Sequence, residues 1–298
     1  MYSKESRATK FRKLLEKDKP VVAVAIGDAL GARMAENAGI QALVMSGSSM
    51  SNLLIGTSDV GILSYGEIRN NLLNIVNATT IPIIVDADTG YGGTLPIYRM
   101  VREYEAMDIA GIQIEDQIFP KMCAYYSNTA VVSGEEMCDR IRAAVKARTN
   151  PDFYIIARTD AAKSLGFDEA LRRSQMYYEA GADMIFASVP PSVEDMKRIA
   201  AMPFPVCTSI VEGTVNGELT VNELGDMGFK FVKFPQTLIR ASMKAMYDAL
   251  ETLVRNGSTV EIQDRLCAQK HRAENTALDE YSAFNAMISA ESPISVQE

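Results

Sequence analysis

Eight short apolar runs, rich in β-branched residues, recur along the chain and constrain its fold more than any other feature. Each run is continuous rather than alternating, which is typical of strands buried on both faces of a parallel sheet. The predicted strands are Val21–Ile26, Ala42–Met45, Ile81–Asp88, Gly111–Asp116, Phe153–Asp160, Met184–Val189, Phe204–Val211 and Phe229–Phe234. Amphipathic segments between them predict helices such as Tyr98–Met107, Gly134–Ala147 and Asp168–Ala180.

Several helices are predicted to end at an Ala-Gly pair just before the next strand, because Gly is favoured at a helix C-cap. The pairs are Ala38-Gly39, Ala110-Gly111 and Ala180-Gly181. Strand–helix units repeated over roughly 250 residues predict an α/β fold of the (β/α)8 TIM barrel type. An open, doubly wound sheet is the alternative.

No shift in composition marks a linker or a second domain within the barrel units. We predict a catalytic barrel over residues 1–257, which includes an N-terminal helix, and a helical extension over residues 258–298. Val260–Gln269 and Leu278–Ile288 predict helices with apolar stripes that a closed barrel does not need. These helices pack either on a neighbouring subunit or around their own barrel.

The charge balance is acidic, with 30 Lys and Arg against 38 Asp and Glu. It argues against a nucleic-acid partner, because nothing would neutralise many phosphates at once. Basic residues concentrate only in the first twenty positions, around Phe11, Leu14 and Leu15, where they predict an amphipathic helix docked on the body rather than a membrane anchor. No run approaches the roughly 20 apolar residues of a membrane span. Four scattered cysteines without a CxxC pair indicate free thiols in a reducing cytoplasm.

The single histidine restricts the chemistry. His271 lies in the polar run Gln269–Arg272, which predicts a solvated helix face. Ser-His-Asp and Cys-His catalysis need a positioned imidazole, and multi-His zinc sites need several. The chemistry must therefore come from carboxylates, Lys, Arg, Tyr, Ser, Cys or a metal.

Acidic side chains follow two neighbouring predicted strands at the end where barrel enzymes place catalysis. Asp86 and Asp88 are expected to point the same way, because side chains alternate along a strand. Glu115, at the end of the next strand, would complete an oxygen-rich corner suited to Mg²⁺, with Mn²⁺ as a substitute. The alternative is that these acids cap helices or pair with Arg158.

Other polar residues at strand ends predict anion binding. Arg158 can bind a substrate carboxylate in a bidentate fork, and the run from Ser46 to Ser49 offers hydroxyl and backbone N–H groups. Lys121 lies two residues from Cys123, where its charge would lower the thiol pKa and prime it as an acid or base. A surface loop with an incidental cysteine explains that spacing equally well.

These residues resemble the isocitrate lyase/phosphoenolpyruvate mutase superfamily, over a stretch from Phe11 to about Gly257. The motifs that carry the resemblance are Val85-Asp86-Ala87-Asp88-Thr89-Gly90-Tyr91-Gly92, Ile114-Glu115-Asp116-Gln117, Pro120-Lys121-x-Cys123 and Ile156-Ala157-Arg158-Thr159-Asp160. The resemblance implies a (β/α)8 barrel whose last helix swaps between subunits, usually in a tetramer that is a dimer of dimers. It raises the expectation that the C-terminal helices are intersubunit elements.

The resemblance also implies a metal site and a binding site for the acid end of the substrate. Asp88 would hold Mg²⁺, mostly through water, and Asp86 and Glu115 would complete the site. Ser46 and Gly47, together with Arg158, would bind the 2-oxo or 2-hydroxy acid.

A gating loop is implied as well. Lys121 and Cys123 would lie on it, and in the lyases the Cys is the acid or base at the developing carbanion. Asp59 matches a loop acid near the active site, and Arg240 matches an arginine that reaches a second substrate carboxylate.

Five positions depart from the lyase pattern, among them Ala124, which stands where the lyase loop has a glycine. The lyase loop typically reads Lys-Arg/Lys-Cys-Gly-His, whereas Met122 and Tyr125 replace its second cation and its histidine here. Ser188 and Ser209 occupy positions where the lyases carry a Glu and an Asn. Phosphoenolpyruvate mutases differ too, with Lys-x-Asn-Ser on the loop, so the chain matches neither branch in full.

The first hypothesis is therefore a Mg²⁺-dependent carbon–carbon lyase that acts on a small substituted 2-hydroxy di- or tricarboxylate and releases a 2-oxoacid such as pyruvate or glyoxylate. The expected assembly is a homotetramer in the cytoplasm, without membrane or nucleic-acid partners. Carbon–phosphorus chemistry, as in a phosphonopyruvate mutase or hydrolase, is the second hypothesis. A non-catalytic binding protein that retained the metal site is the third.

Overall fold

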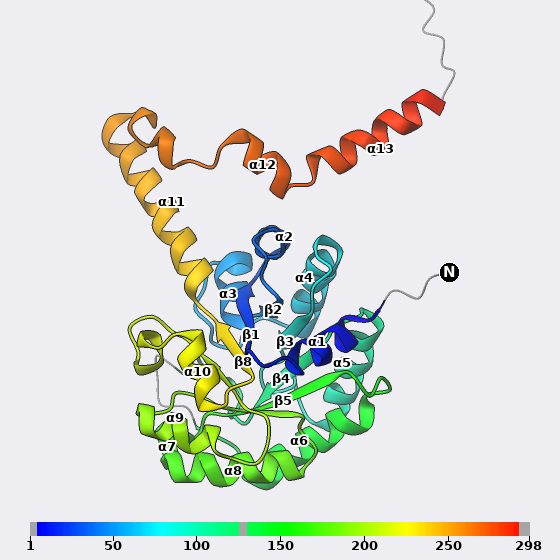
Figure 1. Cartoon of the computed structure of the whole chain (residues 1–298), viewed down its shortest axis with the longest axis vertical. Coiled ribbons are helices and arrows are strands. Elements are labelled where there is room, and N and C mark those ends of the chain that lie inside the picture. Colours follow the sequence, from blue (N-terminus) through cyan, green and yellow to red (C-terminus); the bar gives the residue numbers. More distant parts are fainter. Residues whose placement is uncertain (1–4, 125–129, 292–298) are drawn as a thin grey trace, which may run out of the picture. The chain divides into compact units, whose positions relative to one another are not determined.

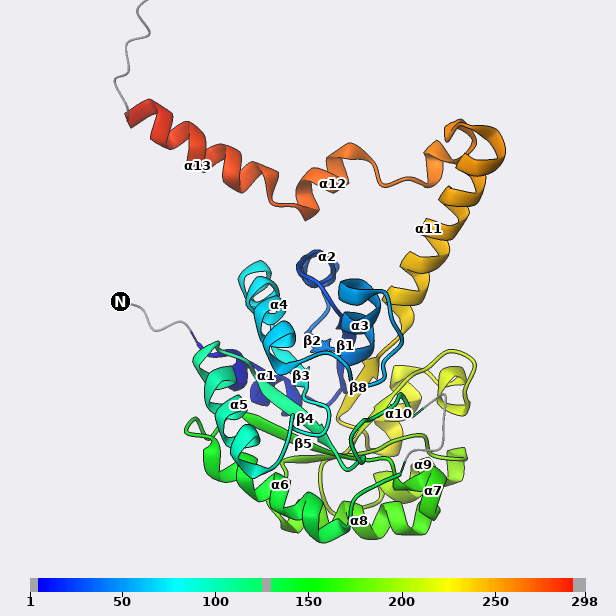
Figure 2. The same ribbon diagram turned by 180° about the vertical axis from the view of Figure 1, so that it is seen from behind.

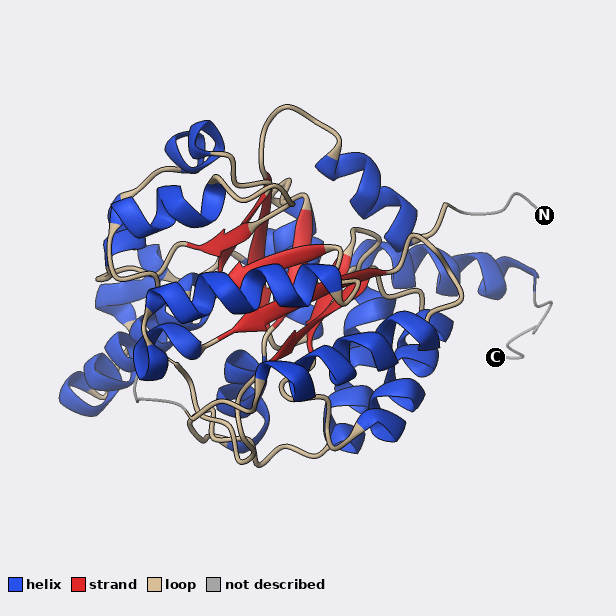
Figure 3. Ribbon diagram, turned by 90° about the horizontal axis from the view of Figure 1, so that it is seen from below, coloured by secondary structure: helices blue, strands red, loops and turns tan. Residues whose placement is uncertain are grey.

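The computed structural model describes residues 5–124 and 130–291. Eight parallel strands form one sheet in the order β6-β5-β4-β3-β2-β1-β8-β7. A parallel bridge between Ile185 and Val206 joins the two ends of that order, so the sheet closes into a barrel. The closure confirms the predicted TIM barrel and excludes the open doubly wound sheet. Figure 3 shows the strands in the centre with helices around them.

The strands are short and lie within the predicted runs. They are β1 Val21–Ile26, β2 Ala42–Met45, β3 Ile83–Asp86, β4 Gly111–Glu115, β5 Tyr154–Thr159, β6 Met184–Ala187, β7 Cys207–Ser209 and β8 Phe231–Phe234.

Helices connect the strands and follow one another around the outside of the barrel, as α4, α5, α6 and α8 do in Figures 1 and 2. The α-helices are α1 Arg7–Leu15, α2 Ala29–Asn37, α3 Gly47–Ile55, α4 Tyr65–Ala78, α5 Thr94–Ala106, α6 Gly134–Ala147, α7 Ala161–Leu165, α8 Phe167–Glu179, α9 Val193–Ala200, α10 Val221–Met227, α11 Thr237–Asn256, α12 Gln269–Asn275 and α13 Leu278–Glu291. Two 3-10 helices are η1 Val215–Glu218 and η2 Val260–Arg265.

Helix α1 covers the N-terminal end of the barrel. Phe11 is fully buried, and its ring meets those of Tyr154 and Phe231 edge-on, each with centroids 5.2 Å apart. Both partners are the first residues of their strands, so the phenylalanine seals the barrel at that end. The predicted docking of the N-terminal helix on the body is confirmed.

Two of the three predicted Ala-Gly caps are present. Gly39 and Gly181 have φ of 88° and 107°, the left-handed conformation that favours glycine after a helix. The third prediction is wrong, because Gly111 is the first residue of β4. A Cβ there would lie 2.2 Å from the carbonyl oxygen of Tyr154, so glycine is needed for close strand contact instead.

The described chain divides into two compact units, residues 1–240 and 241–298, and the division falls within α11. The helix predicted over Val260–Gln269 is wrong: η2 ends at Arg265, and α12 begins only at Gln269. The helix predicted over Leu278–Ile288 is confirmed as α13. His271 lies exposed on α12, as predicted. Among the described residues, no helix has the length and apolar character that crossing a membrane requires.

Candidate active site

A cavity opens among the polar residues at the C-terminal ends of the strands. Its interior and open mouth together measure about 650 Å³, a size typical of small-molecule sites. The lining residues come from most of the barrel strands and from the loops that follow them: Val44, Ser46, Ser48, Asp59, Asp86, Gln113, Lys121, Met122, Cys123, Arg158, Phe186, Ser188, Ser209, Lys233, Pro235 and Gln236. The structure therefore brings together most of the predicted site residues.

Lys121 forms ion pairs with two of the predicted acids, Asp59 and Asp88. Its Nζ lies 2.5 Å from Oδ1 of Asp59 and 2.7 Å from Oδ1 of Asp88, and its side chain is 3% exposed. Burial opposes the charge on Lys121, but Asp88 and the carboxylates around it raise the pKa of the amine well above its ordinary value. Lys121 is therefore a fixed ammonium rather than a base.

Asp88 lies outside strand β3, which ends at Asp86. Its φ is 47°, in the left-handed region, so the argument that Asp86 and Asp88 alternate along one strand is wrong here. The turn, rather than strand periodicity, brings Asp88 to Lys121. Burial raises the pKa of Asp88 to about 6, although Lys121 opposes the rise.

Arg158 is held by two carboxylates. One of its NH groups lies 3.0 Å from Oε2 of Glu115, and its Nε lies 3.0 Å from Oδ2 of Asp160. Pairing with Arg158 is the predicted alternative to metal binding for these acids, and Glu115 does form this pair. Burial nevertheless raises the pKa of Glu115 well above its ordinary value, despite the charge on Arg158.

The acids at this corner outnumber the cations. Five carboxylates (Asp59, Asp86, Asp88, Glu115 and Asp160) lie close to three cations (Lys121, Arg158 and Lys233). Oε1 of Glu115 is buried without a hydrogen-bond partner among the described residues, whereas Oε2 of Glu115 and Oδ1 of Asp88 have only their ion pairs with Arg158 and Lys121.

The donor chemistry and charge of this corner fit a divalent cation. The described residues nevertheless contain no group of three or more His, Cys, Asp or Glu side chains arranged to hold a metal directly. The corner therefore suits a hydrated divalent cation, which keeps several of its waters and needs few direct ligands.

The start of helix α3 forms one wall of the site. Ser46 is its N-cap, and the Ser46 hydroxyl accepts a hydrogen bond from the backbone N–H of Ser49 at 3.4 Å. A Cβ on Gly47 would lie 3.1 Å from Oδ1 of Asp88 and 3.3 Å from Nζ of Lys121. Glycine thus lets the helix N-terminus, with its free N–H groups, approach the charged cluster closely.

The loop after β4 is anchored to the site by backbone hydrogen bonds. The N–H of Cys123 donates to the carbonyl oxygen of Asp59 at 3.2 Å, and the N–H of Met122 donates to Oε1 of Gln117 at 3.0 Å. Gln117 in turn donates to Oδ2 of Asp160 at 2.8 Å. Cys123 is partly exposed and lines the cavity, whereas Tyr125 lies outside the described residues.

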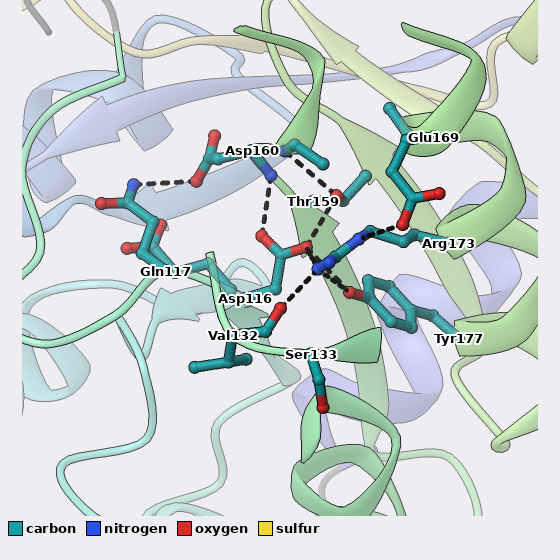
Figure 4. Close-up of polar contacts among 12 residues, drawn as sticks. Asp116, Gln117, Val132, Ser133, Thr159, Asp160, Glu169, Arg173 and Tyr177 are labelled. Atoms are coloured by element: carbon teal, nitrogen blue, oxygen red, sulfur yellow. Dashed lines mark hydrogen bonds and ion pairs between the residues drawn. The ribbon is translucent and has the colours of Figure 1, made fainter. Parts of the chain in front are cut away.

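A buried network centred on Asp116 supports the site from behind (Figure 4). Asp116 is fully buried and accepts hydrogen bonds from the Thr159 hydroxyl at 2.7 Å, the Asp160 N–H at 2.9 Å and the Tyr177 hydroxyl at 2.8 Å. Arg173 completes it with an ion pair of 3.1 Å. The network fixes the end of β5 against the end of β4, and so positions Arg158.

Comparison with known proteins places the chain in a family. The family model described as phosphoenolpyruvate phosphomutase matches residues 11–254. A 2,3-dimethylmalate lyase of Eubacterium barkeri is 41% identical over 260 residues, which cover 87% of this chain and 90% of the relative.

Two solved structures agree. The crystal structure of a 2,3-dimethylmalate lyase has a TM-score of 0.88 at 32% identity and covers 96% of both chains. A phosphonopyruvate hydrolase in complex with oxalate and Mg²⁺ has a TM-score of 0.85 at 28% identity, covering 95% of this chain and 99% of that one.

The chain belongs to the isocitrate lyase/phosphoenolpyruvate mutase superfamily. The predicted family is therefore confirmed, and so is the prediction of an enzyme of its carbon–carbon lyase class.

Three of the positions that depart from the superfamily's lyases line the cavity: Met122, Ser188 and Ser209. The Ser188 hydroxyl is buried without a hydrogen-bond partner among the described residues. Arg240 lies elsewhere: it is 54% exposed, donates to the Glu212 carbonyl oxygen at 3.2 Å and is not among the cavity-lining residues.

The charged cavity residue Lys233 was not predicted from the sequence. Lys233 points into the barrel from β8 and is 3% exposed, and burial lowers the pKa of its amine. A lysine inside the apolar run Phe231–Phe234 is the signal that could have revealed it, because a charge is costly in a doubly buried strand.

Proposed function

We propose that this enzyme is a Mg²⁺-dependent carbon–carbon lyase. It would cleave a substituted 2-hydroxy di- or tricarboxylate into a 2-oxoacid, such as pyruvate or glyoxylate, and a carboxylate. The observation that carries the proposal is the convergence of Lys121, Cys123 and Arg158 with the acidic corner on one cavity. The similarity to 2,3-dimethylmalate lyase supports the substrate class.

The metal would be held by Asp88, mostly through water, and Asp86 and Glu115 would complete the site. When bound, Mg²⁺ would supply positive charge that stabilises the oxygen of the forming 2-oxoacid. Lys121 keeps Asp88 in place from the other side, through an ion pair of 2.7 Å.

The acid end of the substrate would lie between Arg158 and the N-terminus of α3. Arg158 is oriented by Glu115 and Asp160, so its guanidinium is preorganised for a carboxylate. The N–H groups after Ser46 add partial positive charge on the other side.

Proton delivery is assigned to Cys123. A carboxylate of the acidic corner accepts the proton of the substrate 2-hydroxyl, and the hydroxyl oxygen forms the new C=O bond as the carbon–carbon bond breaks. The electron pair of the broken bond remains on the carbon next to the carboxylate of the leaving fragment, and the Cys123 Sγ–H donates a proton to that carbon. The hydrogen bond from the Cys123 N–H to the Asp59 carbonyl oxygen positions Cys123 beside the residue whose carboxylate pairs with Lys121.

The test follows 2-oxoacid release across a panel of alkyl-substituted malates, with lactate dehydrogenase as the coupling enzyme. We expect Mg²⁺-dependent release that falls about 100-fold or more in Cys123→Ser. Cys267→Ser, at an exposed cysteine outside the cavity, is the matched control and should retain full activity. Equal rates for Cys123→Ser and wild type would refute the role of the thiol.

Carbon–phosphorus chemistry is the second candidate, because the phosphonopyruvate hydrolase shares the fold over nearly its whole length. Met122 on the loop and Ser188 in the cavity replace groups typical of lyases. Phosphorus NMR with phosphonopyruvate decides between the two. New phosphate or phosphoenolpyruvate signals would favour this candidate, and an unchanged spectrum at high enzyme concentration would eliminate it.

We further propose a homotetramer in which residues 241–298 contact partner subunits. Apolar side chains recur at three- and four-residue intervals on this segment and are exposed, among them Met243, Tyr247 and Leu250 on α11 and Tyr281 and Phe284 on α13. Light scattering after size exclusion should give four times the 32.6 kDa chain mass. A monomeric mass would contradict the proposal.

The cytoplasm is the proposed compartment, since the structure places none of Cys123, Cys138, Cys207 and Cys267 in a disulfide. Subcellular fractionation followed by immunodetection tests this, and recovery in a secreted fraction would oppose it.

A further inference from the structure

Lys233 is a buried cation whose close contacts are all neutral. Its Nζ lies 2.5 Å from Oε1 of Gln113 and 3.4 Å from the centroid of the Phe186 ring. Among the described residues, no carboxylate lies within 4.0 Å of this amine, whereas Lys121 and Arg158 each pair with two. A buried charge without a counter-ion destabilises the folded state. A lysine at this position is therefore better explained by a ligand that it binds than by the stability of the fold.

The surroundings of the amine hold it firmly in place. Gln113 accepts from Lys233 through its oxygen and donates to Oδ1 of Asp86 at 3.5 Å, which fixes the amide orientation. Arg158 lies over the same Phe186 ring, with its Cζ 5.7 Å from the centroid. Two cations therefore approach one ring, and only Arg158 has its charge balanced by direct contacts.

The cavity offers this amine access to a ligand. Lys233, Ser188 and Ser209 all line it, together with Phe186. Ser188 is 1% exposed, and its buried hydroxyl has no hydrogen-bond partner among the described residues. An ammonium without a counter-ion and a hydroxyl without a hydrogen-bond partner among the described residues, both on one cavity, are complementary to a single anionic group.

We propose that Lys233 determines substrate specificity by binding the carboxylate at the end of the substrate remote from Arg158, with Ser188 donating a second hydrogen bond. The inference rests on the proposed function, because it takes the ligand to be a 2-hydroxy acid whose first carboxylate lies at Arg158. It makes the enzyme selective for dicarboxylates over 2-hydroxy acids that end in an alkyl group.

The test compares malate with lactate, which differ by the carboxylate at the open end. Their binding is measured by calorimetry with Mg²⁺ present for wild type, Lys233→Met and Lys233→Arg. We expect Lys233→Met to weaken malate binding about 10- to 100-fold and lactate binding less than about twofold. Lys233→Arg should restore most of the preference for malate.

Lys230→Met is the matched control, because Lys230 is exposed just before β8 and its loss changes the net charge equally. This control should bind both ligands as wild type does. Equal weakening of malate and lactate in Lys233→Met, or no weakening of either, would overturn the inference. Both ligands are bound rather than turned over, so a failure to cleave any substituted malate would refute the proposed function without affecting this result.

Discussion

Arg173 offers a direct test of the network behind the candidate active site. Its guanidinium lies 3.1 Å from Oδ2 of Asp116, donates to the Val132 carbonyl oxygen at 2.8 Å and pairs with Glu169 at 2.9 Å. The guanidinium also donates to the Tyr177 hydroxyl at 3.2 Å, and substitution by Met keeps much of the apolar stem but removes all four contacts. Asp116, which is fully buried, would then retain only neutral donors.

The expected cost is large. Removing one partner of a buried ion pair costs about 3–5 kcal/mol, because the remaining charge stays desolvated. Tyr177→Phe removes the 2.8 Å hydrogen bond to the same carboxylate and the 3.2 Å hydrogen bond that the hydroxyl accepts from Arg173, and it should cost about 1.5–3 kcal/mol. The free energy of unfolding of a native protein is roughly 5–15 kcal/mol, so Arg173→Met should remove a large part of the stability.

Arg172 is the matched control. It is the neighbouring residue and also pairs with Glu169, at 2.7 Å, but its side chain is 55% exposed. An exposed pair contributes about 0–1 kcal/mol, so Arg172→Met should change little.

The assay is urea unfolding followed by circular dichroism at one fixed protein concentration. We expect the loss of stability to increase from Arg172→Met through Tyr177→Phe to Arg173→Met. If Arg173→Met unfolded at the same urea concentration as Arg172→Met, the buried network would not stabilise the barrel, and the reasoning would be refuted.

Three further predictions concern the cavity. Chelation by EDTA should abolish 2-oxoacid release and added Mg²⁺ should restore it, whereas full activity after exhaustive chelation would exclude the metal. Gly47→Ala should lower kcat/KM up to about 100-fold with little change in urea midpoint, because its methyl group would press on Lys121 and Asp88; unchanged kinetics would contradict the close approach. Lys233→Met should raise the urea midpoint at pH 7, because the folded-state pKa of this lysine lies below its ordinary 10.5 and the buried charge destabilises the fold. That gain should shrink as pH rises toward 10.5, since the wild-type lysine then loses its proton; a gain that did not depend on pH would point to packing instead.

The local sequence predicted the strands well and their ends less well. Continuous apolar runs identified all eight strands, since a strand buried on both faces must be apolar throughout. The run that ends at Asp88 extends past β3, because the backbone turns at that residue, with a φ of 47°. Composition alone does not show such a turn.

The C-terminal segment shows the same limit. Apolar spacing predicted a helix over Val260–Gln269, but the chain forms only a short 3-10 helix before α12. Spacing reports which side chains avoid water, and it does not fix the backbone conformation of a short segment.

The sequence by itself determined the barrel, the superfamily and the strand ends that carry the chemistry. Hydrophobic periodicity and motifs are properties of short stretches of sequence, so they can be recognised without coordinates. Only the tertiary structure decided which charges meet: Lys121 with Asp59 and Asp88, Arg173 with Asp116, and Lys233 with Gln113. These partners are separated by up to 120 positions along the chain, and closure of the barrel brings them within contact distance.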